Sequence, residues 1–243
     1  MNAILSKVLS AFLFPSERRR AWRTRAKIRE LSRNNEIDVC EEVFPRIKLK
    51  VVGTGNRIVV RRLLAGKGVL SIVVIGNGCN VEIGERTSIG QLLRISIGNQ
   101  HKYLGPVEDV RVSIGRSVGF GEDATIMTYN SHARVEIGDE SMFGPGAMIY
   151  QTDGHPMYDL ATGRMTNHVG TLHIGRHVWA GTRTTFLKNV FVPDGCIVGF
   201  GSVVTRRFTE TNCVISGNPA TCVRTGVEWK YGDPEYVANR VVM

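Results

Sequence analysis

A six-residue period runs through the stretch from His173 to Thr205. Aliphatic or aromatic residues return at every sixth position, and a second set of mostly apolar or small residues lies two positions before each of them. This period fits neither the 3.6-residue repeat of a helix nor an unbroken strand alternation. It fits short strands joined by tight corners, which is the pattern of a parallel β-helix built from hexapeptide repeats. The first set is Ile174, Ala180, Phe186, Val192, Val198 and Val204, and the second is Leu172, Val178, Thr184, Val190, Cys196 and Ser202.

The same period is legible earlier in the chain, in three blocks separated by breaks of phase. We predict a mainly β protein whose β-helix covers residues 41–226, with the first coils degenerate. The longest break predicts an inserted loop at residues 155–173, and because insertions in a solenoid gather at corners of a functional face, this loop is the first site candidate. The inward residues of the three blocks are Ile83, Ile89 and Ile95, then Ile114, Phe120 and Ile126, then Ile137, Phe143 and Ile149.

The two ends of the chain lie outside the repeat. Residues 1–40 are predicted to form a helical extension, and residues 227–243 a tail with a short C-terminal helix. Within the extension, residues 17–30 hold seven Arg or Lys against two Glu, in a chain of net charge +9. Such a cluster suggests an anionic partner, namely a membrane surface, nucleic acid or acidic polysaccharide, with a solvated helix face as the alternative. We favour peripheral contact with an anionic membrane through residues 16–30, and expect no nucleic-acid partner.

Two further features bear on the compartment. No segment approaches the 18 apolar residues of a membrane span. The short apolar run at residues 8–14 comes before the basic residues, not after them, and no small-residue cleavage site follows it, so we expect no signal peptide. The cysteines are odd in number and show no paired spacing, so we read them as reduced thiols. These features predict a cytoplasmic protein, peripheral to the inner membrane. The cysteines are Cys40, Cys79, Cys196, Cys213 and Cys222.

The segment TDGHP, at residues 152–156, carries the strongest chemical hint. His155 lies six residues after Ile149, where the next inward aliphatic residue is due, and Asp153 occupies the second inward phase. A histidine near its ordinary pKa suits general-base work on a hydroxyl or an amine. The carboxylate of Asp153 is placed to orient the imidazole, as the third member of a catalytic triad does. The alternative for His155 is a turn residue with a satisfied hydrogen bond.

Trp179 lies where the long loop rejoins the repeat, in the segment HVWAG. It either packs against its neighbours or forms a wall of the site. The backbone N–H groups of Ala180, Gly181 and Thr182 are expected to be accessible at the following corner, where they can hold a carbonyl or an oxyanion. We expect this corner to face the break at His155.

Hydroxyl and cationic groups gather near the end of the repeat, at Thr205, Arg206, Arg207 and Arg224. They suit phosphate groups, because guanidinium and hydroxyl donors make strong hydrogen bonds to phosphate oxygens. The alternative is a set of solvated surface charges.

Three histidines raise the question of a metal. The spacing of His132, His168 and His173 is similar to the zinc sites of hexapeptide-repeat carbonic anhydrases, where the ligands meet on facing coils. The inserted residues break the register between His132 and His168, so we expect no metal site.

The order of four segments resembles one family. TDGHP, IGRHVWAG, VGFGSVVTR and SGNPA follow one another as in the left-handed β-helix acyltransferases, in particular the bacterial sugar and polysaccharide O-acetyltransferases. The resemblance covers roughly residues 75–226 and implies a left-handed β-helix that assembles as a homotrimer. It also implies that acetyl-coenzyme A lies in the groove between neighbouring prisms.

The resemblance implies roles for individual residues. His155 is implied to be the base that deprotonates the acceptor hydroxyl for direct attack on the thioester, and Trp179 to line the groove near the acetyl group. Coenzyme contacts are implied for Thr182, Phe200, Thr205, Arg206 and Arg224.

The sequence also departs from the galactoside acetyltransferase type. Gly121 stands where that type carries a sugar-binding Asn, Phe200 replaces a small residue, and Thr221 replaces a Lys or Arg. The resemblance therefore favours O-acetylation of a sugar hydroxyl in a surface polysaccharide (capsule, lipopolysaccharide or exopolysaccharide) over a free galactoside. The alternatives are acetyl transfer to a small acceptor (an amino-sugar nucleotide, an antibiotic or serine) and, from another class, a zinc-dependent carbonic-anhydrase-like β-helix protein.

Overall fold

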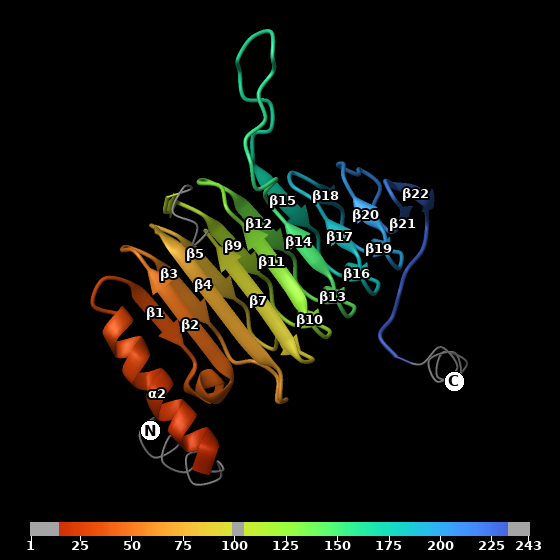
Figure 1. The fold of residues 1–243 in the computed structure, drawn as a ribbon. Coiled ribbons are helices and arrows are strands. Elements are labelled where there is room, and N and C mark those ends of the chain that lie inside the picture. Colours follow the sequence, from red (N-terminus) through yellow and green to blue (C-terminus); the bar gives the residue numbers. More distant parts are fainter. Residues whose placement is uncertain (1–14, 99–104, 233–243) are drawn as a thin grey trace, which may run out of the picture.

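A computed structural model describes residues 15–98 and 105–232 of the chain. Parallel strands stack into three flat sheets that form the sides of a three-sided prism (Figure 1). The predicted mainly β fold, a left-handed parallel β-helix of hexapeptide repeats, is confirmed. Each complete coil contributes one strand to each side, and we number the sheets I, II and III in the order in which the chain passes through them.

The strands have the following bounds. Sheet I contains β1 (Glu36–Val39), β3 (Arg57–Val60), β5 (Asn80–Ile83), β9 (Arg111–Ile114), β12 (Arg134–Ile137), β15 (Thr171–Ile174) and β18 (Phe191–Val192). Sheet II contains β6 (Ser88–Ile89), β10 (Gly119–Phe120), β13 (Met142–Phe143), β16 (Trp179–Ala180), β19 (Ile197–Val198), β21 (Val214–Gly217) and the antiparallel β22 (Ala220–Arg224). Sheet III contains β2 (Ile47–Val52), β4 (Val69–Asn77), β7 (Leu92–Ile97), β11 (Ala124–Thr128), β14 (Met148–Tyr150), β17 (Thr185–Phe186) and β20 (Val203–Val204), and β8 (Val107–Glu108) pairs with β4.

The six-residue period becomes a stack of aligned coils. Ile83, Ile114, Ile137, Ile174 and Val192 occupy the same register in sheet I. The two inward sets predicted between Leu172 and Val204 are buried at every position, none more than 1% exposed. The prism therefore has a continuous core that every coil extends by the same amount, as expected for a solenoid.

The corners turn the chain by one repeated device. From Val178 on, the residue just before each second-set inward residue adopts a left-handed backbone conformation, as at His177 (φ 52°), Arg183 (φ 56°) and Asn189 (φ 61°). This conformation reverses the local twist of the chain, so that a small inward residue fills the corner and the next strand begins on the next side. We call the corners I/II, II/III and III/I after the sheets that they join.

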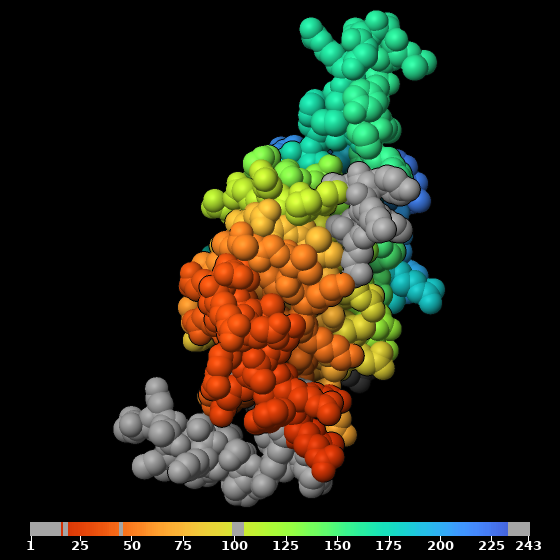
Figure 2. All heavy atoms as spheres, turned by 60° about the vertical axis from the view of Figure 1, so that its left-hand side comes forward, coloured from red at the N-terminus to blue at the C-terminus, as the bar shows by residue number. Residues whose placement is uncertain are grey.

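The ends of the prism are covered differently. Helix α2 (Pro15–Leu31) packs against the short 3₁₀ helix η1 (Glu41–Arg46) and against β2. Figure 2 looks toward this amino-terminal end and shows the helix over the first strands. Strand β1 pairs with β3, so the first coil begins at Glu36, within the residues assigned to the extension from sequence.

The carboxy-terminal end folds back along the prism. Residues 225–232 contain no helix and run back along the outside of the prism (Figure 1). The short C-terminal helix predicted within residues 227–243 therefore does not begin before residue 233, and residues 233–243 lie outside the described residues. In the described part of the chain, no helix is both long and apolar enough to cross a membrane.

The inserted loop leaves the prism between β14 and β15. It projects from corner III/I as a narrow excursion (Figure 1), and Tyr158 and Met165 form an antiparallel bridge within it. The loop therefore carries its residues away from the core, and its base alone is fixed by the stacked coils.

Candidate active site

A buried asparagine fixes the turn that carries His155. The side chain of Asn167 is 7% exposed, and its Nδ2 donates to Asp153 Oδ2 at 2.9 Å and to the carbonyl oxygen of His155 at 2.8 Å. Its Oδ1 accepts a hydrogen bond from the backbone N–H of Met157 at 2.8 Å. Two of these hydrogen bonds hold the backbone of the turn and the third holds the Asp153 carboxylate, while His155 itself is exposed.

Asp153 has different partners from those expected. Its carboxylate pairs with the ammonium group of Lys188, at 3.3 Å between Oδ2 and Nζ, and accepts the hydrogen bond from Asn167. Within the described residues, no hydrogen bond joins Asp153 to the imidazole of His155. The expectation that Asp153 orients this ring is therefore not met, because a cation from the next coil and a buried amide hold the carboxylate.

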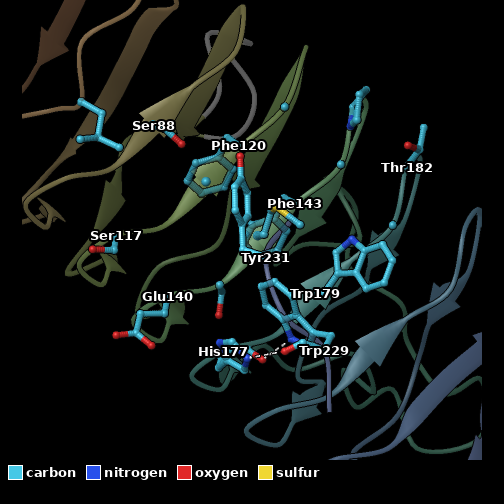
Figure 3. Close-up of a pocket in the computed structure, with 18 of the residues that line it drawn as sticks. Ser88, Ser117, Phe120, Glu140, Phe143, His177, Trp179, Thr182, Trp229 and Tyr231 are labelled. Carbon is cyan, nitrogen blue, oxygen red and sulfur yellow. Dashed lines mark hydrogen bonds between the residues drawn. The ribbon is translucent and has the colours of Figure 1, made fainter. Parts of the chain in front are cut away.

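Trp179 lies on the wall of a large groove. The groove has a volume of about 910 Å³ and runs along the outer face of sheet II, between corners I/II and II/III. Its floor is formed by small or flexible outward residues, and aromatic rings stand at its carboxy-terminal end (Figure 3). The residues that line the groove include Arg86, Ser88, Ser117, Gly119, Glu140, Met142, Trp179, Thr182, Trp229 and Tyr231.

The carboxy-terminal segment forms part of this groove. Trp229 Nε1 donates to the carbonyl oxygen of His177 at 2.8 Å, and His177 Nε2 lies 3.0 Å from the carbonyl oxygen of Trp229. The two rings are stacked with their centroids 4.2 Å apart, and the Trp179 ring lies 6.1 Å from that of Trp229. We call residues 225–232 the strap. Since Trp229 is bonded at both its ring and its backbone, the strap is held firmly on sheet II.

The predicted coenzyme residues divide between two places in the chain. Thr182 lies at corner II/III beside Trp179, and Phe200 occupies the same corner one coil further on, with a side chain that is 71% exposed. Arg224 ends β22 in sheet II. Thr205 and Arg206, by contrast, follow β20 at corner III/I, the corner that carries the His155 loop.

One detail of the predicted corner is corrected by the structure. The side chain of Ala180 is fully buried in the core, which does not bear on the prediction for its backbone N–H. The N–H of Gly181 donates to the carbonyl oxygen of Val198 at 2.8 Å and is not accessible to an oxyanion. This N–H is used in the hydrogen bonding between stacked coils. Arg207 also differs from expectation, because its guanidinium lies over the Phe191 ring, 5.1 Å from the centroid.

His155 and Trp179 lie on opposite parts of the prism. His155 belongs to corner III/I, and Trp179 to sheet II, which is the side facing away from that corner in a three-sided prism. Figure 1 shows the loop and the strands of sheet II at opposite edges of the molecule. The expectation that the corner after Trp179 faces His155 is therefore wrong for a single copy of the chain.

The three histidines considered as metal ligands are separate. His132 lies 3.5 Å from Asp109, whose pKa is lowered to about 2, chiefly by a hydrogen bond from Arg134. His173 Nδ1 is 3.0 Å from Glu136 Oε2 in sheet I, and His168 is exposed on the loop. Among the described residues, no group of three His, Cys, Asp or Glu side chains is arranged to hold a metal ion.

Several residues of the site were not found from sequence. Asn167 and Lys188 fix the His155 turn, but each reaches it from another part of the chain, and no spacing signals this. His177, Trp229 and Tyr231 shape the groove. His177 was detectable in principle, since it occupies the left-handed corner position, whereas the strap lies beyond the repeat and has no periodic signal.

Known proteins share this fold and part of the sequence. No protein-family model matches the chain. The chain is 32% identical over 122 residues to a polysialic acid O-acetyltransferase of Neisseria meningitidis, covering 48% of this chain and 55% of that protein. It is 29% identical over 123 residues to a polysialic acid O-acetyltransferase of Escherichia coli O1:K1 / APEC, covering 51% of this chain and 39% of that protein. The chain thus spans only 39% to 55% of the length of these curated relatives.

A solved structure extends the comparison. The crystal structure of the polySia-specific acetyltransferase NeuO matches with a TM-score of 0.60 at 21% identity, covering 82% of this chain and 91% of that one. The resemblance to the β-helix acyltransferases is confirmed by these findings: the chain has their fold, and its sequence is similar to those of polysialic acid O-acetyltransferases.

Proposed function

We propose that this chain is an O-acetyltransferase that moves an acetyl group from acetyl-coenzyme A to a sugar hydroxyl of a bacterial surface polysaccharide. The observation that carries this proposal is the exposed His155 on a turn clamped by Asn167, at the place where the hexapeptide period of an acyltransferase fold is broken. The similarity to polysialic acid O-acetyltransferases supports a polymer as acceptor over a nucleotide sugar, an antibiotic or serine.

The chemistry is a direct transfer. His155 accepts the proton of the acceptor hydroxyl as its oxygen attacks the carbonyl carbon of the thioester. The tetrahedral intermediate then collapses, the carbon–sulfur bond breaks, and the coenzyme A thiolate takes the proton from the imidazolium. The imidazole therefore acts as general base in the first step and as general acid in the second.

We propose that the working form is a homotrimer with composite sites. Corner III/I of one copy would lie against sheet II of the next, bringing His155, Thr205 and Arg206 from one copy to Trp179, Thr182, Phe200 and Arg224 of its neighbour. A contact between two different surfaces repeats from copy to copy, and it gives a closed ring when the rotation between neighbours closes. The separation of the two residue sets within one chain supports this arrangement.

This arrangement also assigns the coenzyme a direction. From Trp179, the groove-side residues Thr182, Phe200 and Arg224 follow one another toward the carboxy-terminal end of the prism. The acetyl group would lie at Trp179 and the pantetheine arm at corner II/III. The phosphates would lie near Arg224 and the neighbour's Arg206, since guanidinium groups bind phosphate well.

The proposal is tested by measuring release of the coenzyme A thiol with purified protein, acetyl-coenzyme A and a panel of acceptors. The panel contains oligosialic acid, other acidic and neutral oligosaccharides, a nucleotide sugar and serine. We expect thiol release that depends on an oligosaccharide and produces an acetylated glycan by mass spectrometry. Release with serine or the nucleotide sugar alone would favour the small-acceptor alternative, and stoichiometric zinc with no transferase activity would favour the hydratase class.

We expect Asn167→Ala to lower kcat by roughly 10- to 100-fold while the KM for acetyl-coenzyme A stays within twofold, because loosening a reacting group by about 1 Å has a cost of this order. Asn167 is a positioning residue, since it acts through the backbone of His155. Steady-state kinetics and circular dichroism of the variant provide the measurement. Arg164→Ala, a change to an exposed side chain on the same loop, serves as the matched control, and equal losses in both variants would argue against the clamp.

We further propose that the protein is cytoplasmic and that α2 holds it at an anionic membrane surface. Arg25 pairs with Glu41 at 2.8 Å and helps to hold the helix on the prism. Ala21 and Ile28 face the core. Trp22, 71% exposed, and the exposed Arg19 and Arg23 share the face opposite these two, because they lie three and four residues apart. An aromatic ring among cationic side chains suits an anionic lipid interface.

We expect Arg19→Glu combined with Arg23→Glu to weaken binding to phosphatidylserine-containing vesicles by about tenfold or more, since each basic residue near such a surface contributes about 1 kcal/mol. Co-sedimentation at several salt concentrations provides the measurement. Arg94→Glu, an exposed change on sheet III, is the matched control. Unchanged vesicle binding in the double variant would remove α2 as the membrane contact.

A further inference from the structure

The groove on sheet II extends away from the proposed coenzyme path. The coenzyme residues lie from Trp179 toward the carboxy-terminal end, whereas the groove runs from Trp179 across β13 and β10 to Ser88 on β6. Three steps between neighbouring strands span about 14 Å, since strands lie about 4.8 Å apart. The groove therefore leaves room for a second ligand that meets the acetyl group at Trp179.

The floor of this groove is open because its side chains are small. Gly119 occupies the centre, and a Cβ atom there would lie 3.3 Å from Ser88 Oγ and 3.6 Å from Met142 Cγ. Gly119 has an ordinary backbone conformation, so a glycine is not needed here for its backbone angles. Its effect is to leave the space above the strand unfilled. The hydroxyl groups of Ser88 and Ser117 line this hollow and offer hydrogen-bond donors and acceptors.

The strap adds an aromatic wall to the groove. Trp229 is 7% exposed and is fixed by His177, whereas the ring of Tyr231, two residues on, is 83% exposed and lines the groove. Figure 3 shows Trp179, Trp229 and Tyr231 following one another along the pocket. An anchored tryptophan is thus followed by an exposed tyrosine that lines the same groove as Gly119.

The chemistry of these walls favours a sugar ring. Aromatic faces stack on the C–H faces of an amphipathic ligand, while serine hydroxyls, Arg86 and Glu140 can pair with its hydroxyl groups. The single guanidinium of Arg86, at the amino-terminal end of the rim, is also suited to a sugar carboxylate. A phosphate-rich ligand is disfavoured, because Glu140 offsets the charge of Arg86.

We propose that the groove formed by the strap and by sheet II is the acceptor subsite, in which a saccharide unit next to the acetylated one stacks on Tyr231. This inference rests on the proposed transferase function, and it assigns a role to residues outside the hexapeptide repeat. Tyr231 is a specificity residue here, and Trp229 positions it.

Direct binding to the full-length protein tests this without any transfer. Oligosialic acid and maltotriose are titrated separately, with ligand contacts followed by saturation-transfer NMR and affinity by calorimetry. We expect Tyr231→Ala to lower the affinity for the glycan by roughly 3- to 10-fold, which is the usual contribution of an aromatic contact. Tyr231→Phe, which keeps the ring, should stay within twofold, and Gly119→Leu, which fills the floor, should weaken binding further.

Two controls separate the possible outcomes. Lys230→Ala removes an exposed strap residue that does not line the groove, and it should bind glycan as the wild type does. The KM for acetyl-coenzyme A should be unchanged in Tyr231→Ala, while the acceptor KM rises in parallel with the loss of binding. If wild-type protein binds glycan through Tyr231 and transfers no acetyl group, the proposed function fails and the subsite stands.

Other results would overturn the subsite. They are wild-type protein that binds neither glycan, glycan binding that is unaffected by Tyr231→Ala and Gly119→Leu, or a rise in the KM for acetyl-coenzyme A alone. Transfer that proceeds with a normal acceptor KM in both variants would leave the transferase function standing without this subsite.

Discussion

Replacing His155 with Ala is expected to lower the rate of acetyl transfer by about 10²- to 10⁴-fold, the usual contribution of a general base. The imidazole lies on an exposed turn, and its backbone is held by Asn167, so removing the ring leaves the clamp intact. The affinity for acetyl-coenzyme A should stay within about twofold. Thiol release measures the rate, and calorimetric titration of the coenzyme measures the affinity.

The loop supplies its own control for this experiment. His168 is exposed on the same loop, and among the described residues its one hydrogen bond is from Asn189 Nδ2 to its backbone carbonyl, at 2.9 Å. His168→Ala should therefore retain wild-type transfer. If His155→Ala transfers acetyl at the wild-type rate, the proposed mechanism is wrong. An equal loss in the two variants would place the effect in the loop as a whole.

The fold was predictable from sequence because the period of six is a direct consequence of the structure. Each strand with its corner takes six residues, so Ile174, Ala180 and Phe186 fall on three successive sides, and all are fully buried as predicted. The position of a residue within the six-residue period also indicates the side of the prism on which it lies. Counting from Ile149 places His155 just after sheet III, and Trp179 immediately precedes the sheet II residue Ala180. That count places them on opposite parts of the prism, and the expectation that the corner after Trp179 faces His155 did not take it into account.

The site was less predictable, since it depends on contacts that the period does not encode. Asp153 was assigned to the imidazole because they are neighbours in sequence, but Lys188, one coil further on, pairs with the carboxylate at 3.3 Å. The corner N–H of Gly181 was assigned to an oxyanion, but stacking on the next coil uses it. Trp229 and Tyr231 follow the last repeat, and only the folded strap places them beside Trp179.

The composite site predicts that two inactive variants restore each other. His155→Ala and Trp179→Ala should each be poor enzymes, because each removes one side of every site. Co-expressed in equal amounts, they should regain about a quarter of the wild-type activity, since in random assembly this fraction of the interfaces joins an intact His155 to an intact Trp179. A site within one chain would give no gain, because every copy would lack one of the two residues.

The reverse mixture sharpens the same argument. The double variant, carrying both substitutions on one chain, is co-expressed in equal amounts with wild-type protein. Composite sites then leave about a quarter of the activity, since both neighbours at an interface must be wild type, whereas sites within one chain leave about half. Sedimentation velocity must show trimers in both mixtures. His155 leaves the prism at corner III/I and Trp179 lies on the side facing away from it, so the proposed composite trimer predicts a quarter in each mixture.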